Sequence, residues 1–178
     1  MDLELDYSIY GTHRLPLVGL SQWLSATGRP VKKVMEIGCG QMSTRLFLNR
    51  RVFPELEQLI SLESSKIWAF AIHTLFGGDK RLSLRYTEDE GELVRDALNS
   101  APFDVILVDG ATNEGRAKAV PICLGAAGFV VLHDVQEPDL MEATRLAPHC
   151  VFSVIESPWT AIMSNNEPPF GYDNGRKG

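Results

Sequence analysis

Cysteine is scarce in this sequence: three residues among 178, standing far apart at Cys39, Cys123 and Cys150. An odd number at wide spacing argues against a disulfide framework and a zinc cluster, and it suits a reducing compartment. We therefore expect a cytoplasmic protein whose three thiols are buried as small apolar groups.

Long apolar runs and an excess of positive charge are also missing. No run approaches the roughly 20 residues that a membrane-spanning helix needs, and the acidic segment Met1 to Asp6 lacks the basic start of a signal peptide. Acidic residues outnumber Lys and Arg by 23 to 17, which gives a net charge of −6. An acidic chain binds nucleic-acid phosphates poorly, so we expect neither a membrane nor a nucleic-acid partner.

Apolar strand-like runs alternate with helix-like segments along most of the chain, which is long enough for one domain with its own core. Runs such as Val105 to Val108 are apolar at every position, which is typical of strands buried on both faces of a parallel sheet. The expected strands span 31–37, 58–62, 81–86, 103–108 and 128–132, and the expected helices span 15–26, 42–51, 65–76, 91–99, 114–124 and 139–147. This alternation predicts a right-handed α/β fold, a three-layer α/β/α sandwich around a Rossmann-like sheet.

The C-terminal part of the pattern is different. Two strand-like runs, 150–156 and 160–164, are separated only by Ser157-Pro158-Trp159. Such a short link cannot cross over a sheet, so the mostly parallel sheet is expected to end in a C-terminal antiparallel hairpin. We expect one domain over 1–164, with an N-terminal lid and helix over 1–30 and the Rossmann-like core over 31–164, and a flexible tail over 165–178.

A glycine turn follows the first expected strand, in the stretch Glu36-Ile37-Gly38-Cys39-Gly40. Glycine allows a sharp turn and a close approach to a ligand because it has no Cβ. A strand, a glycine turn and a helix N-terminus together form a nucleotide-type pocket in an α/β sheet. The stretch departs from the G-x-G-x-x-G pattern at its last position, which is Ser43.

At this point the chain resembles the class I S-adenosylmethionine-dependent methyltransferases over roughly residues 15–164. The resemblance rests on four features in order: Glu36 to Gly40, Glu63 at the end of the second strand, Phe103 to Gly110, and the terminal hairpin. The pairing of Val108-Asp109-Gly110 with Leu132-His133-Asp134 is similar to the small-molecule O-methyltransferase branch.

This resemblance implies a binding site for S-adenosylmethionine (SAM). Glu36 would attract the ammonium of the ligand, Glu63 would accept from its ribose hydroxyls, and Asp89 or its neighbour would accept from its adenine amine. Glu63 also has an ordinary alternative as a helix-capping acid. The implied binding residues are Glu36, Gly38, Cys39, Gly40, Ser43, Glu63, Ser64, Glu88, Asp89 and Asp109.

The same resemblance implies catalytic roles for Asp109, His133 and Asp134. Asp109 and Asp134 follow neighbouring strands, and related enzymes hold a divalent metal with such a pair, which makes Mg²⁺ a candidate cofactor held by Asp109 and Asp134. The third ligand of the family, an Asn, is replaced by Val135, and Asp109 has the alternative of only orienting the glycine turn. His133 is the best candidate for a general base, with the alternative of a histidine that is only hydrogen-bonded under the loop.

The expected function is SAM-dependent methyl transfer to a small-molecule acceptor, at a hydroxyl oxygen. Two alternatives stay open: a non-catalytic adenosyl-binding or partner-binding module, and a nicotinamide-dependent oxidoreductase, against which the hairpin argues. A homodimer is a further expectation, because a minimal core often needs a partner to complete its cleft. Outside the site, Tyr10, His13 and Arg14 either fold over the cofactor as a lid or are exposed without a role. We expect packing roles for Trp23, Trp68, Phe70 and His73.

Overall fold

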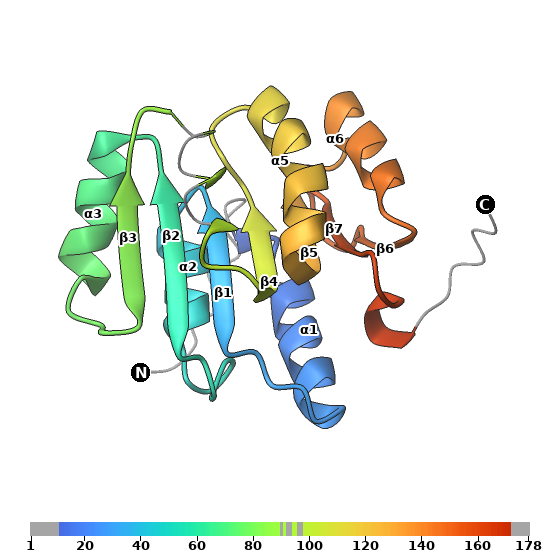
Figure 1. Cartoon of the computed structure of the whole chain (residues 1–178), viewed down its shortest axis with the longest axis horizontal. Coiled ribbons are helices and arrows are strands. Elements are labelled where there is room, and N and C mark those ends of the chain that lie inside the picture. The colour runs from blue at the N-terminus through green and yellow to red at the C-terminus, as the bar shows by residue number, and fades with distance from the viewer. Residues whose placement is uncertain (1–10, 90, 92–93, 96–97, 172–178) are drawn as a thin grey trace.

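The computed structural model describes residues 11–89, 91, 94–95 and 98–171. Its centre is a seven-stranded sheet in the order β3-β2-β1-β4-β5-β7-β6 (Figure 1). The first five strands pair in parallel, and β7 runs antiparallel to both β5 and β6. The strands are β1 (Lys33–Ile37), β2 (Gln58–Glu63), β3 (Leu82–Tyr86), β4 (Phe103–Val108), β5 (Ala127–His133), β6 (His149–Ser153) and β7 (Thr160–Ser164).

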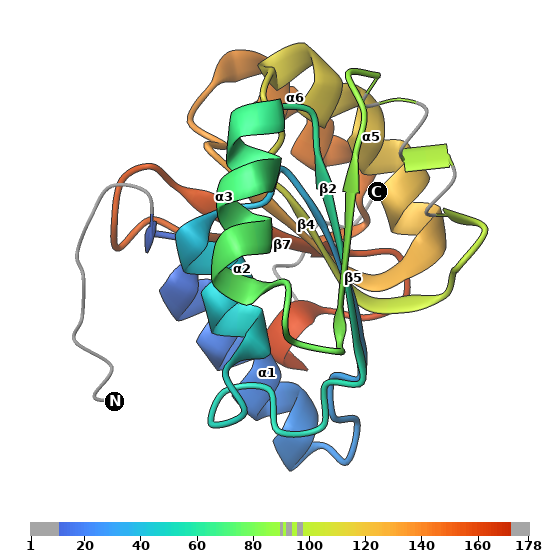
Figure 2. The ribbon, with the colours of Figure 1, turned by 90° about the vertical axis from the view of Figure 1, so that its left-hand side faces the viewer.

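Helices cover both faces of this sheet, which confirms the predicted three-layer sandwich. One face carries α1 (Arg14–Ala26), α2 (Gln41–Leu48) and α3 (Lys66–Phe76), and the other carries α5 (Asn113–Ala126) and α6 (Pro138–Ala143) (Figures 1 and 2). Short 3₁₀ turns follow at Thr144–Leu146 and Pro169–Gly171. The helix expected over 91–99 lies largely outside the described residues.

The central strands have the burial that their sequence predicts. Val105 and Leu107 of β4 face the cluster formed with α1 and α2, whereas Ile106 and Val108 face the cluster formed with α5 and α6. All four side chains are at most 1% exposed. The three cysteines are buried as well, as expected. Successive side chains of a strand point to opposite faces, so a run that is apolar at every position belongs between two layers.

Several element ends differ from the prediction. β6 ends at Ser153, so residues 154–159 link it to β7 and the exposed Val154 and Ile155 belong to the link. α2 ends at Leu48 because the side chain of Asn49 accepts from the amide of Arg51 and begins a turn. α6 gives way to a 3₁₀ turn after Ala143. The hairpin itself is confirmed, because Phe152 pairs with Ala161 in antiparallel register.

The expectation that Trp68 and Phe70 pack in the core is wrong. These two side chains of α3 are 51% and 73% exposed, and His73, which was expected to serve packing, is exposed as well. Ala69 and Ile72 are the buried residues of this helix. α3 lies over the outer strands β2 and β3 (Figure 2), and at this edge only one narrow stripe of the helix meets the sheet. The helical period of an apolar pattern does not reveal that the sheet stops there.

The chain packs beyond the end of β7. The ring of Phe170 lies 5.8 Å from that of Trp23, and the amide of Asn165 donates to the carbonyl of Leu124 at 3.0 Å. The first part of the expected tail, up to Gly171, is therefore held against the domain. Among the described helices, none combines the length and the apolar character needed to cross a membrane.

Candidate functional site

The glycine turn lies at the carboxyl end of β1, against the end of β4. The amide of Gly38 donates to the carbonyl of Leu62 at 2.9 Å, and the amide of Asp109 donates to the carbonyl of Ile37 at 2.8 Å. Gly38 has a φ of 81°, and a Cβ placed on it would lie 2.1 Å from the carbonyl oxygen of Asp109. A Cβ on Gly40 would meet only the Ser43 hydroxyl, at 3.5 Å. Packing alone therefore explains why position 38 is a glycine, but it does not explain why position 40 is one.

Glu36 is completely buried below this turn. Its Oε1 accepts from Thr44 Oγ1 at 2.6 Å and from the hydroxyl of Ser61, while Oε2 has no partner within the described part of the chain. Burial raises the pKa of the Glu36 carboxyl to about 7, against the opposing effect of the nearby hydroxyls. A buried oxygen without a partner is costly, so this site suits a ligand that carries an N–H or a positive charge.

The raised pKa of Glu36 predicts how stability changes with pH. As pH rises from 4.5 to about 7, the unfolded chain loses this proton before the folded chain does, so the contribution of Glu36 to stability falls. Glu36→Gln has no proton to lose, so its free energy of unfolding relative to wild type should rise by about 2 to 3 kcal/mol between pH 5 and pH 8. Urea denaturation at the two pH values measures this change.

The comparison with wild type isolates Glu36 from other groups. Burial lowers the pKa of His13 from 6.5 to about 4, and this contributes with the opposite sign, but it is present in both proteins and cancels from the difference. Glu57→Gln, at an exposed position, is the matched control. A Glu36→Gln difference that stayed constant with pH would contradict the assigned pKa.

Glu63 is the last residue of β2, and its carboxylate links the glycine turn after β1 to the start of α3. Its Oε2 accepts from the amide of Cys39 at 3.1 Å, and its Oε1 accepts from the amide of Ser65 at 2.7 Å. The cap of α3 is Ser65 itself, whose hydroxyl accepts from the amide of Trp68. Glu63 therefore lies beside the helix start without being its cap residue. Burial also raises the pKa of the Cys39 thiol.

A cleft of about 580 Å³ opens beside Ser64, the residue that follows Glu63. Its size lies within the range of about 300 to 1,000 Å³ that is usual for ligand sites. Residues that follow β2, β3 and β4 line it together, although they are distant in sequence: Ser64, Glu88, Asp89, Gly91, Ala111 and Thr112. The sequence predicted Ser64, Glu88 and Asp89 here but missed the loop after β4, whose only signal is its place directly behind Asp109-Gly110.

Asp109 and His133 form a pair at the ends of β4 and β5. His133 Nδ1 lies 3.2 Å from Asp109 Oδ1, and His133 Nε2 lies 2.8 Å from Thr12 Oγ1. Burial alone would raise the pKa of Asp109, but the hydrogen bond to His133 and the nearby positive charges outweigh it and hold the pKa below its usual value. The imidazole ring is thus held from both sides, and its Asp109 partner is kept ionised.

Arg116 of α5 joins the two acids, and sequence reasoning missed it. Its Nη2 lies 3.2 Å from Asp109 Oδ1, its Nη1 forms a short ion pair with Asp134, and its Nε donates to the carbonyl of Gly110 at 2.6 Å. Asp134 reaches the guanidinium from a left-handed backbone with a φ of 61°. The neighbouring ends of β4 and β5 therefore bring the two carboxylates to one cation.

Solved structures resemble this chain over most of its length. A candidate O-methyltransferase from Klebsiella pneumoniae matches with a TM-score of 0.65 at 19% identity, over 93% of this chain and 91% of that one. An O-methyltransferase from Bacillus cereus in complex with SAH matches with a TM-score of 0.64 at 14% identity, over 92% and 94% of the two chains. The chain has the class I methyltransferase fold. No protein-family model and no curated protein matches its sequence.

The methyltransferase fold raises the question of a divalent metal between Asp109 and Asp134. The side chains at this position do not fit one, because the Arg116 guanidinium already contacts both carboxylates. Val135, which stands where the resemblance places a third ligand, is fully buried in the core cluster next to α5 and α6. Mg²⁺ held by these two acids is therefore not supported.

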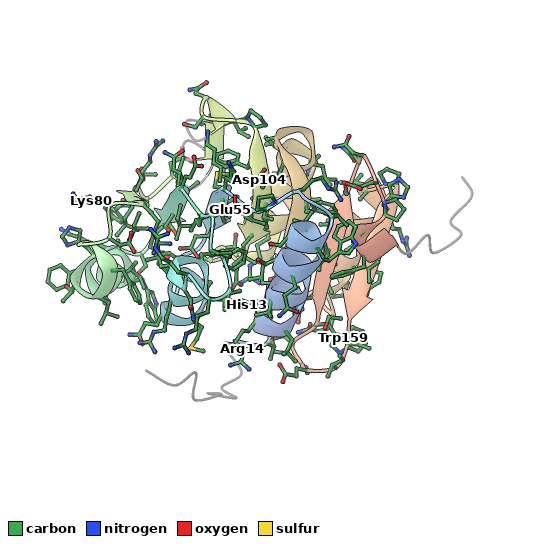
Figure 3. The ribbon with its side chains drawn as sticks, turned by 90° about the horizontal axis from the view of Figure 1, so that it is seen from below. His13, Arg14, Glu55, Lys80, Asp104 and Trp159 are labelled. Atoms are coloured by element: carbon green, nitrogen blue, oxygen red, sulfur yellow. The ribbon has the colours of Figure 1, made fainter. Side chains whose placement is uncertain are left out.

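His13 comes from a different part of this methyltransferase fold, directly before α1 (Figure 3). It is 2% exposed, and its ring meets that of His133 edge-on with centroids 5.0 Å apart. Neither ring nitrogen has a hydrogen-bond partner among the described residues. His13 is thus part of the site interior, whereas Tyr10 of the expected lid lies outside the described residues. The nitrogen and oxygen donors of His13, Asp109 and His133 lie within 4.8 Å of one another.

Proposed function

We propose that this protein is a SAM-dependent methyltransferase that acts on a hydroxyl oxygen of a small-molecule acceptor. The observation that carries the proposal is the Asp109–His133 pair, which lies at the edge of the sheet where the ligand cleft opens. In an open α/β sheet this is the edge at which ligands bind. The fold of the O-methyltransferases named above supports the reaction class.

The proposed SAM site runs along the ends of β1, β2 and β3 and reaches Asp109 at the end of β4. The buried Oε2 of Glu36 fits an ammonium, Glu63 fits ribose hydroxyls, and Asp89 in the cleft fits the adenine amine. Bound SAM would supply a methyl group carried on a sulfonium. The full proposed set is Glu36, Gly38, Cys39, Gly40, Ser43, Glu63, Ser64, Glu88, Asp89 and Asp109.

The proposed acceptor site lies at the ends of β4 and β5. The proton of the acceptor hydroxyl passes to His133 Nε2, which would exchange its contact with Thr12 Oγ1 for one with the acceptor. Asp109 orients the ring at Nδ1 and stabilises the positive charge that then forms, and Asp134 completes the acidic wall. Aligning acceptor and methyl group is the other main contribution of the protein, a proximity effect of about 7 kcal/mol or more. The ring of His13 is neutral, and its donor and acceptor have no partner among the residues that the structure describes, so it can bind a polar group of the acceptor.

Calorimetry with S-adenosylhomocysteine tests the cofactor half of the proposal. We expect wild type to bind one molecule per chain, and Glu63→Ala to weaken binding about 10- to 100-fold because a charged acceptor is lost. Glu57→Gln, on an exposed part of the surface, should bind as wild type does. Failure of wild type to bind would remove the proposal.

Turnover across a panel of small hydroxyl compounds separates the remaining alternatives. Formation of S-adenosylhomocysteine with any of them supports the enzyme. Binding without turnover on every compound would favour the non-catalytic adenosyl-binding module. Binding of NAD in place of SAM would favour the oxidoreductase. A homodimer and a cytoplasmic location stay predictions of the sequence.

A further inference from the structure

The side chain of Arg116 is mostly buried and makes a full set of polar contacts. Its side chain is 11% exposed, and all three guanidinium nitrogens are engaged: by Asp109, by Asp134 and by the carbonyl of Gly110. A planar guanidinium with a fixed set of donors matches such an arrangement better than a lysine ammonium would. The side chain therefore has one position, between the two acids.

The local sequence builds this position. Thr112 caps α5, with its hydroxyl accepting from the amide of Gly115 at 3.0 Å, so Arg116 stands at the start of the helix. Side chains of a helix lean toward its N-terminus, which here points at the end of β4 and at Asp109. The left-handed backbone of Asp134 turns the second carboxylate to the same place. Elements from three parts of the chain thus converge on the guanidinium.

The net charge of Asp109, Asp134 and Arg116 explains why the guanidinium would exclude a divalent cation. As carboxylates, Asp109 and Asp134 carry two negative charges, of which Arg116 neutralises one. The charge that remains matches the single positive charge of a sulfonium. A divalent cation added beside Arg116 would instead make the cluster positive, and repulsion between like charges is stronger in a partly buried site than in bulk water.

We infer that Arg116 is the resident cation of this site, taking the place between Asp109 and Asp134 that a divalent metal would occupy, so that the pair binds no metal. The inference uses the proposed function only for the sulfonium charge. It also assigns Arg116 as a positioning residue, because the guanidinium shares Oδ1 of Asp109 with His133 Nδ1 and so fixes the carboxylate that orients the ring.

Binding of Mn²⁺, followed by electron paramagnetic resonance of the free ion, tests this without SAM or acceptor. Wild type should bind no Mn²⁺ at this centre with a Kd below about 1 mM. Arg116→Ser removes the cation and leaves both acids, so it should gain one Mn²⁺ per chain, and Asp134→Asn in the same background should remove that site again. Arg116→Lys keeps a positive charge and should bind none. Circular dichroism confirms that each variant is folded, and Arg116→Gln replaces Arg116→Ser if the latter is not.

Each other result decides against the inference. Mn²⁺ binding by wild type that Asp134→Asn abolishes would show that the acids accept a metal despite Arg116. Mn²⁺ binding by wild type that His13→Gln abolishes would place a metal on the His13, Asp109 and His133 donors instead. A folded Arg116→Ser variant that gains no site would show that the guanidinium does not stand in a metal position. None of these results depends on SAM binding, so the proposed function can survive the failure of this inference.

Discussion

Replacing Gly38 with alanine is expected to lower the free energy of unfolding by at least about 3 kcal/mol. The added Cβ would lie 2.1 Å from the carbonyl oxygen of Asp109 and 2.8 Å from the Cα of Gly110, and both atoms belong to the backbone. The φ of 81° adds strain for any residue with a Cβ. Since β1 and β4 are central strands joined just below this point, relieving the clash would separate them.

Gly40→Ala is the matched control, two residues away in the same turn. A Cβ there would make ordinary contact with the Ser43 hydroxyl, and φ is −146°, so we expect a loss within about 1 kcal/mol. Chemical denaturation of both variants measures the difference. Equal losses of unfolding free energy in the two variants would show that the close backbone contacts around position 38 are not the reason why it is a glycine. If Gly38→Ala does not fold at all, its yield of soluble protein relative to Gly40→Ala gives the same ranking.

Replacing His133 with asparagine is expected to lower the turnover number for methyl transfer about 100- to 10,000-fold, the usual contribution of a positioned general base. Asparagine can keep a hydrogen bond to Asp109 or Thr12, but it cannot accept the proton of an acceptor hydroxyl. The affinity for S-adenosylhomocysteine should stay within a factor of about three, because all the proposed SAM contacts except Asp109 lie at or after the ends of β1 to β3, and asparagine can keep the hydrogen bond to Asp109. Steady-state kinetics on an acceptor found by the panel, together with calorimetry, checks both parts.

His73→Asn, at an exposed position of α3, makes the same chemical change outside the site and should leave turnover unchanged. If His133→Asn kept more than about a tenth of the wild-type turnover, the base role would be wrong and proximity alone would account for the rate. A parallel loss of S-adenosylhomocysteine affinity would instead show that the substitution disturbs the cofactor site.

Much of the fold follows from local patterns that depend on near neighbours in the chain. The continuous apolar run at Val105 to Val108 marked a strand buried on both faces, and the short link near Pro158 required the antiparallel ending. The exact ends of helices and strands were harder to predict, because turns such as the one that Asn49 makes with Arg51 depend on side-chain hydrogen bonds. The exposure of Phe70 could not be predicted from the sequence, because the residue pattern of a helix does not show where the sheet beneath it ends.

By itself, the sequence determined the α/β/α architecture, the reversed last strand and the candidates Asp109, His133 and Asp134, because strand period, link length and strand-end position are local properties. The tertiary structure decided which groups meet at these candidates. His13 arrives from before α1 and Arg116 from the start of α5, and neither shows a motif. A hydrogen bond or ion pair between residues far apart in the chain depends on how the layers pack. That packing gave the two acids a shared arginine partner.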